Sequence, residues 1–357
     1  MKATSLHLTA LGSVILSLSF ISTVRAQTEL NLPYASQKAL IRQRIGVTDI
    51  TVSYHRPLVN GRKIWDELVP LGKVWRAGAN ENTTIEFGTP VSVEGKPLPA
   101  GKYGLHMIPT SDSWTIIFSK MAVAWGSYTY SEAEDALRVS VKPRANEMEE
   151  ALEYEFEDLK PDSVAVTMKW EKLAVPFRVA VNETETVLSS IRNELRGHAQ
   201  YTWGPLQEAA QYCLTKKVAL EEALRWADRS IQTEERFENL TTKAELLDAL
   251  NKPEEALKVW NHALEISSAV QVYSYGRQLQ NEKRETDAME TFAEVAKRFP
   301  QNAFGHLAQA RIKSAAGDFP GAIEAVKKAQ NAATSEEQKT SLQPLLDKLQ
   351  AKQDINK

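Results

Sequence analysis

A short segment centred on alanine recurs four times in the second half of this chain. The alanines are Ala223, Ala256, Ala288 and Ala322, so successive copies are separated by 33, 32 and 34 residues. Around them the chain is rich in Ala, Leu, Glu, Gln and Lys, which favour helices. Such a period is typical of stacked helix pairs, because one pair cannot bury its apolar face alone.

Two further positions keep the same period. The residue four places after each alanine is Ala227, Trp260, Phe292 or Val326, and the residue twelve places before is Gln211, Ala244, Gly276 or Ala310. This pattern resembles the tetratricopeptide repeat, with a small residue on its first helix and Ala plus a large apolar residue on its second. The unit from Val272 to Pro300 matches best, whereas Gln211 makes the first unit degenerate.

The composition changes at about Asn182. Before it, apolar and polar residues alternate in short stretches separated by turns, as in Val164 to Trp170 and in the pair Tyr103 to Met107 and Trp114 to Phe118. Period two indicates strands with one buried face. Eight or nine such strands predict an antiparallel β-sandwich, followed by a tetratricopeptide-like α-helical repeat domain.

The N-terminus is typical of a secretory signal peptide. Lys2 supplies the positive start, Leu8 to Val24 is apolar, and Val24-Arg25-Ala26 fits a cleavage site. A membrane anchor is the alternative, but the apolar core is short for a span of ~20 residues. We therefore divide the chain into a signal peptide (1–26), an irregular or helical lead-in (27–46), a β-sandwich (47–181), helical repeats (182–349) and a disordered tail (350–357).

Charge and cysteine content narrow the functional class. The net charge is −3 before signal cleavage, and no basic block suggests a nucleic-acid partner. The single cysteine, Cys213, excludes an intrachain disulfide. A secreted protein without disulfides fits a bacterial periplasm, and no later apolar run is long enough for a transmembrane segment.

The central stretch carries longer motifs. They are Arg56-Pro57, Gly61-Arg62, Leu68-Val69-Pro70, Gly72-Lys73-Val74-Trp75-Arg76, Gly78-Ala79-Asn80, Pro99 to Leu105, Trp114 to Ile117, Trp125-Gly126 and Asp135 to Arg138. Over roughly residues 30–181 the chain is similar to an uncharacterised family of secreted bacterial domains of unknown function. The resemblance implies a secreted β-domain, often followed by helical repeats, and no known reaction.

No motif of a known catalytic mechanism, cofactor or metal site is present. The nucleophile elbow, the zinc motif His-Glu-x-x-His and the phosphate loop are all missing from the sequence. We expect no catalytic residue, no cofactor and no metal. One alternative is a hydrolase that uses His55 or His106 with Arg76 and a carboxylate; the same two histidines with Glu86 are the weaker possibility of a metal site.

Arginine and aromatic residues near strand ends predict a small-ligand or carbohydrate pocket. Arginine donates in pairs to carboxylates, and tryptophan offers a stacking face. The candidate ligand-binding residues are Arg56, Trp75, Arg76, Asn80, His106, Trp125, Tyr128 and Arg138. The competing interpretation is structural: the tryptophans belong to the core, and the arginines pair with Glu67, Glu81, Glu86 or Asp135.

The helical repeats predict a docking surface for a protein or peptide partner. The candidate residues are Trp226, Tyr273, Tyr275 and Phe304, with inter-helix core as the alternative. The favoured function is therefore a secreted, non-catalytic binding protein. In a further alternative, the β-domain is purely structural and the repeats alone carry the function.

Overall fold

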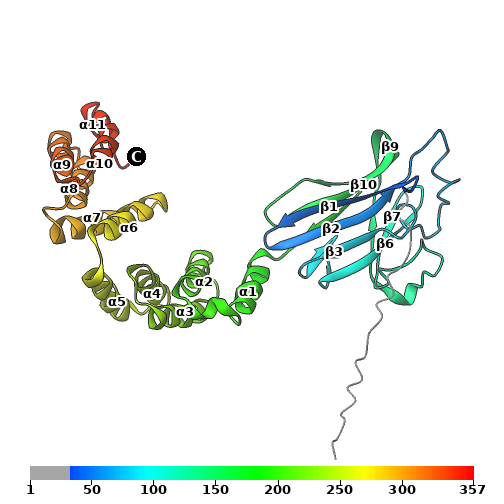
Figure 1. The fold of residues 1–357 in the computed structure, drawn as a ribbon, viewed down its shortest axis with the longest axis horizontal. Coiled ribbons are helices and arrows are strands. Elements are labelled where there is room, and N and C mark those ends of the chain that lie inside the picture. The colour runs from blue at the N-terminus through cyan, green and yellow to red at the C-terminus, as the bar shows by residue number, and fades with distance from the viewer. Residues whose placement is uncertain (1–32) are drawn as a thin grey trace, which may run out of the picture.

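The computed structural model describes residues 33–357, so the predicted signal peptide lies outside the described residues. A β-domain comes first, and helices follow from α1 (Glu183–Glu194) to the C-terminus (Figure 1). The predicted order of a β-domain and then helical repeats is confirmed. Among the described residues, each helix is too short or too polar to cross a membrane.

Two antiparallel sheets make up the β-domain. The six-stranded sheet has the order β1 (Gln37–Ile45), β2 (Thr48–Arg56), β3 (Thr84–Phe87), β6 (Gly101–Pro109), β7 (Trp114–Ser119) and β8 (Asp135–Val141). The four-stranded sheet has the order β5 (Lys96–Leu98), β4 (Val91–Val93), β10 (Ser163–Ala180) and β9 (Arg144–Glu157).

The core of the β-domain lies between the two sheets. Ile85 and Leu105 from the six-stranded sheet and Leu152 and Met168 from the four-stranded sheet are 0% exposed and share one apolar cluster. In each of these strands, residues that face the core alternate with residues that face outward, as the period-two pattern predicts. The β-sandwich prediction is therefore confirmed.

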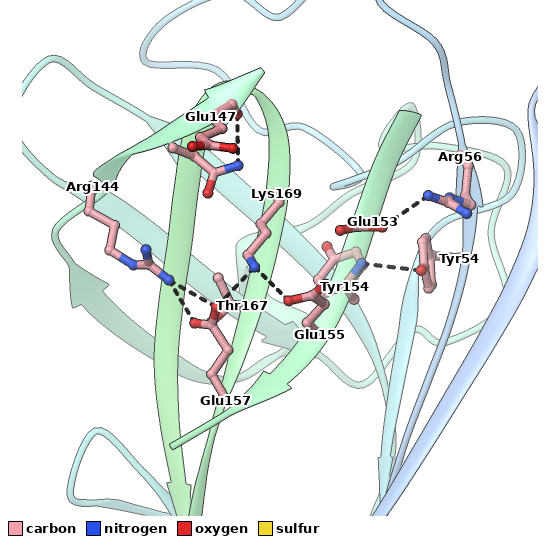
Figure 2. Close-up of polar contacts among 11 residues, drawn as sticks. Tyr54, Arg56, Arg144, Glu147, Glu153, Tyr154, Glu155, Glu157, Thr167 and Lys169 are labelled. Carbon is pink, nitrogen blue, oxygen red and sulfur yellow. Dashed lines mark hydrogen bonds and ion pairs between the residues drawn. The ribbon is translucent and has the colours of Figure 1, made fainter. Parts of the chain in front are cut away.

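Polar contacts cover the outer face of the four-stranded sheet (Figure 2). Lys169 of β10 lies 2.5 Å from Glu155 and 3.0 Å from Glu157 of β9, and Arg144 also donates to Glu157. Thr167 adds a hydrogen bond of 2.7 Å to the same carboxylate. Burial alone raises the pKa of Glu157, but these donors outweigh it and lower the pKa to about 2.

The lead-in segment differs from the prediction. We expected residues 27–46 to be irregular or helical, but Gln37–Ile45 is strand β1, paired with β2 through its whole length. Gly46, at φ +54°, supplies the left-handed residue of the tight turn between them. As an edge strand, β1 exposes Leu40 and so does not show a clean apolar alternation.

The helices follow as antiparallel pairs along an arc (Figure 1). After α1 come α2 (Trp203–Lys216), α3 (Leu220–Thr233), α4 (Phe237–Ala249), α5 (Pro253–Ile266), α6 (Ala269–Asn281), α7 (Glu285–Arg298), α8 (Ala303–Ala315), α9 (Phe319–Ala332), α10 (Glu336–Ser341) and α11 (Gln343–Gln350).

The recurrent alanines occupy equivalent places in this array. Ala223, Ala256, Ala288 and Ala322 lie in α3, α5, α7 and α9 and are at most 6% exposed. On the first helix of its pair, Gly276 faces the Phe292 ring, which a Cβ atom there would approach to 2.6 Å. Small residues therefore allow the helices of a pair to pack closely, as the repeat pattern predicts.

The C-terminal tail is ordered, contrary to the prediction for residues 350–357. Ile355 is 4% exposed, and its carbonyl accepts a hydrogen bond of 2.9 Å from the buried Arg311 of α8. Asp354 accepts from Ser314 at 2.7 Å, and Asn356 accepts from Gln280 at 2.8 Å. The tail thus provides the partners that the buried arginine requires.

Candidate functional site

Residues 120–131, which we call the covering loop, lie over the outer face of the six-stranded sheet. The backbone amide of Asn82 donates to the Ala124 carbonyl at 3.1 Å, and the side-chain oxygen of Asn82 accepts from the backbone amide of Ala124 at 3.0 Å. Gly104 of β6 leaves room for the loop, because a Cβ atom there would collide with the Met121 carbonyl. The loop is therefore fixed directly against the sheet.

His106 is buried beneath this loop. Its side chain is on the outer face of β6, it is 3% exposed, and its Nδ1 lies 2.8 Å from the Ser127 hydroxyl. Burial lowers the pKa of His106 to about 4, and the negative charge of Asp135 opposes this shift only in part. The imidazole is therefore neutral at neutral pH.

Arg76 lies against the same loop at Gly126. Its Nε is buried and has no hydrogen-bond partner among the described residues. A Cβ atom on Gly126 would come within 2.5 Å of its Nη1. Trp125 and Tyr128, which lie close to that glycine in the loop, are 54% and 82% exposed. The structure thus brings four predicted ligand-binding residues to the covering loop: Arg76, His106, Trp125 and Tyr128.

The other predicted residues serve the fold. Arg56 joins the two sheets through Glu153 at 3.0 Å (Figure 2). Trp75 stacks on Trp170 with ring centroids 5.9 Å apart. Arg138 is held by Asp135 and by the Tyr130 hydroxyl, both at 2.5 Å. The side-chain amide of Asn80 donates to the Ser36 carbonyl at 3.3 Å. The structural interpretation predicted such contacts for Trp75 in the core and for Arg138 with Asp135, but Glu153 was not among the partners that it named for Arg56.

A pocket of 230 Å³, which we call the outer-face pocket, opens beside the covering loop. His55, Glu81, Asn82 and Val123 line it, with Lys38 and Lys102 among the other lining residues. Asn82 is 6% exposed, yet its Nδ2 has no partner among the described residues, and neither has Glu81 Oε2. Sequence reasoning missed this pocket; its only signal was the polar run from Asn80 to Asn82 between two strands.

The two histidines that the hydrolase alternative named have different partners. His55 Nε2 lies 3.3 Å from Glu81 Oε2, at ion-pair distance but without hydrogen-bond geometry, whereas His106 contacts Ser127. Burial also lowers the pKa of His55. In the described part of the chain, no cluster of three His, Cys, Asp or Glu side chains has metal-binding geometry.

The helical region contains a second candidate site, the inner groove. It consists of two adjoining hollows of 370 and 640 Å³ that share Thr241, Glu245 and Tyr275. The first is lined by α2, α4 and α6, the first helices of three successive pairs, and Figure 1 shows α2 and α4 on the inner side of the arc. The second extends along α5 and α7.

The groove is polar and acidic. Its first hollow is lined mainly by amide, hydroxyl and carboxylate side chains: Gln207, Gln211, Glu238, Thr241, Thr242, Glu245, Gln271, Ser274 and Gln278. Over both hollows six acidic residues face two basic ones, Arg284 and Lys297. Arg284 is already paired with Glu245 at 2.5 Å and with Asp287 at 2.8 Å, so the remaining lining charges are four acidic residues and Lys297. A positively charged partner is therefore favoured.

Of the four predicted partner-binding residues, only Tyr275 lines the inner groove. Trp226 is 6% exposed, in the core between α2 and α3. Tyr273 is 8% exposed and packs against Phe304 with ring centroids 5.4 Å apart. The polar lining was missed, although it recurs at helical spacing on the first helices, as in Gln207 and Gln211 or Gln271 and Gln278.

Comparison with solved structures gives similarities in the helical region. The structure described as "Crystal structure of YrrB: a TPR protein with an unusual peptide-binding site" is 19% identical, with 46% of this chain and 84% of that chain covered and a TM-score of 0.24. The "MamA RS-1 ArsTM double mutant" is 20% identical, with 45% and 88% covered and a TM-score of 0.26. No curated protein gives a significant sequence match.

A family model matches the β-domain. Residues 36–179 match the family described as "Protein of unknown function (DUF2911)", in agreement with the resemblance seen in the sequence motifs. The match ends at Val179, one residue before the end of β10, and the helices begin at Glu183. The β-domain therefore matches this family of unknown function, and the chain continues beyond it into tetratricopeptide-like helical repeats.

Proposed function

We propose that this protein is a non-catalytic binding protein whose inner groove docks an extended, basic segment of a partner protein. The observation that carries the proposal is the lining of the inner groove, with amide and hydroxyl side chains from the first helices of three successive pairs and acidic side chains from α4 and α7. Glutamine, serine and threonine side chains can donate to and accept from a peptide backbone. Stacked repeats form extended binding surfaces of this kind.

The size of the groove sets the length of the segment. Neighbouring helix axes are about 8–10 Å apart, so crossing from α2 to α6 takes about 20 Å. An extended peptide rises about 3.3 Å per residue, so this distance corresponds to about 6–8 residues. The exposed apolar side chains of Val270 and Leu257, one in each hollow, can accept an apolar residue between basic ones.

Fluorescence anisotropy with the full chain tests this proposal. Three labelled peptides of eight residues, rich in Lys, in Glu or in Ser, are compared at low and high salt. We expect the basic peptide to bind and its affinity to fall with salt, because charge attraction is screened. Equal affinity for all three peptides, or none, would refute the proposal.

A matched pair of variants locates the binding. The double substitution Glu290→Lys with Glu294→Lys reverses two charges in the second hollow, and we expect binding at least ten-fold weaker. The control, Glu254→Lys with Glu255→Lys, makes the same charge change on exposed positions of α5 that do not line either hollow. Equal losses in both variants would indicate non-specific attraction and contradict docking in the groove.

We also propose that the chain is exported and acts in the periplasm. The apolar stretch and the Val24-Arg25-Ala26 motif support this proposal. N-terminal sequencing of the protein from its bacterial host should give Gln27 as the first residue. Recovery of the full-length chain from the cytosol would contradict it.

A further inference from the structure

The outer-face pocket of the β-domain is independent of the inner groove and of the proposal made for it. We propose that this pocket binds a small hydroxylated anion of the sugar-acid class, with Asn82, Glu81, Lys38 and Lys102 as its recognition groups. The first step of the argument concerns Asn82. Its Oδ1 accepts from the Ala124 amide, which fixes the opposite end of the side chain, Nδ2, as a hydrogen-bond donor.

This donor and the acceptor on the preceding residue both lack a hydrogen-bond partner, although the acceptor lies 3.3 Å from His55 Nε2. Asn82 Nδ2 and Glu81 Oε2 are buried and without hydrogen-bond partners among the described residues, and both residues line the pocket. An unpartnered buried polar atom costs about 1–3 kcal/mol, so such atoms are rare without a reason. A ligand hydroxyl satisfies both, because it accepts from Nδ2 and donates to the carboxylate.

The rim of the pocket supplies charge. Lys38 of β1 is the cross-strand partner of His55, and Lys102 of β6 is the cross-strand partner of Glu86. Both lysines line the pocket together with Glu81, and no ion pair holds either of them in the described part of the chain. Two cations against one carboxylate favour a ligand that carries a negative charge as well as hydroxyl groups.

The volume of 230 Å³ limits the ligand to about the size of a monosaccharide, below the 300–1,000 Å³ of drug-sized sites. Val123, which is 87% exposed, adds an apolar contact at the covering loop. A hydroxylated carboxylate of this size can place its carboxylate at the lysines and its hydroxyl groups at Asn82 and Glu81.

Titration calorimetry with the full chain tests the proposal. Glucuronate is the probe, glucose the neutral match, and acetate the match without hydroxyl groups. We expect glucuronate to bind at least ten-fold more tightly than either. Equal binding of glucose, equal binding of acetate, or no heat with glucuronate would each overturn the proposal.

Variants then assign the binding to this pocket. Asn82→Asp keeps the acceptor for the Ala124 amide and replaces the donor by an oxygen, so glucuronate binding should be lost. Lys38→Gln with Lys102→Gln changes exposed side chains only and should weaken binding at least ten-fold. The control Lys73→Gln removes an exposed lysine that does not line the pocket. If the double lysine variant binds like the control, the pocket is not the site and the proposal fails.

Discussion

Two glycines at the start of equivalent helices are predicted to respond in opposite ways to alanine. Gly305 lies in the first turn of α8, and a Cβ atom there would come within 2.8 Å of the Phe299 carbonyl carbon and closer still to its oxygen. That oxygen accepts a hydrogen bond of 3.0 Å from the Asn302 amide. Gly204 lies in the first turn of α2, and a Cβ atom added there would meet no neighbouring atom within 4 Å.

The magnitudes follow from these two environments. Replacing glycine by alanine within a helix stabilises it by up to about 1 kcal/mol, which is the expectation for Gly204→Ala. At Gly305 the obstacle is backbone, and forcing an added methyl group into a packed site costs about 1–3 kcal/mol or more. We therefore expect Gly305→Ala to lower the free energy of unfolding by about 2 kcal/mol.

Thermal unfolding of the full chain, followed by the helical circular dichroism signal, measures the difference. For a region of this size, 1 kcal/mol shifts Tm by about 2–4 °C. Gly305→Ala should thus unfold at least 4 °C below the parent, and Gly204→Ala at or above it. Equal Tm values for the two variants would refute the close approach of Gly305 to the Phe299 carbonyl.

Three further predictions concern the β-domain and the tail. Burial lowers the pKa of His106 to about 4, from an unfolded value of 6.5. The folded state therefore loses up to about 3 kcal/mol of its free energy of unfolding as the pH falls from 6.5 to 4 and the buried imidazole is protonated. In denaturant titrations, His106→Gln should flatten this dependence of stability on pH. The pKa of Glu157 is lowered to about 2, so its contribution to stability is present above pH 4.5 and is lost as the pH falls towards 2. Lys169→Met should move this loss of stability to higher pH. An unchanged profile of stability against pH would contradict the ion-pair cluster. Ile355→Ala should lower the free energy of unfolding of the helical region by about 2–3 kcal/mol, because it empties a buried site. The control Gln353→Ala, at an exposed position, should change it by less than about 0.5 kcal/mol. Equal effects of the two variants would mean that the tail is not packed.

The order of a β-domain and helical repeats could be predicted from the sequence, because the residue pattern of each half is periodic. Small residues such as Gly276 recur where helices approach closely, and alternation marks the strands whose one face is buried. Strand β1 was missed because an edge strand exposes Leu40 on its outer face. The tail was missed because its order depends on Arg311, a buried side chain more than forty residues away in sequence.

The candidate sites were less accessible to sequence reasoning. His106, Arg76 and Trp125 were proposed from residue type, and the structure does bring them to one loop. The outer-face pocket depends on which atoms of Asn82 remain unpaired, and that is decided by the contact with Ala124, a residue of a distant loop. Among the predicted groove residues, aromatic character favoured Trp226, although aromatic side chains bury more area in the core than polar ones do.

Hydrogen–deuterium exchange of the full chain, with and without the basic eight-residue peptide, tests the proposed binding function most directly. The first hollow of the inner groove is lined by α2, α4 and α6, and the second extends along α5 and α7, so the peptide should slow exchange in α4, α6 and α7 and leave the β-domain unchanged. Protection confined to the β-domain, or the same protection with the acidic peptide, would contradict docking of a basic segment in the inner groove.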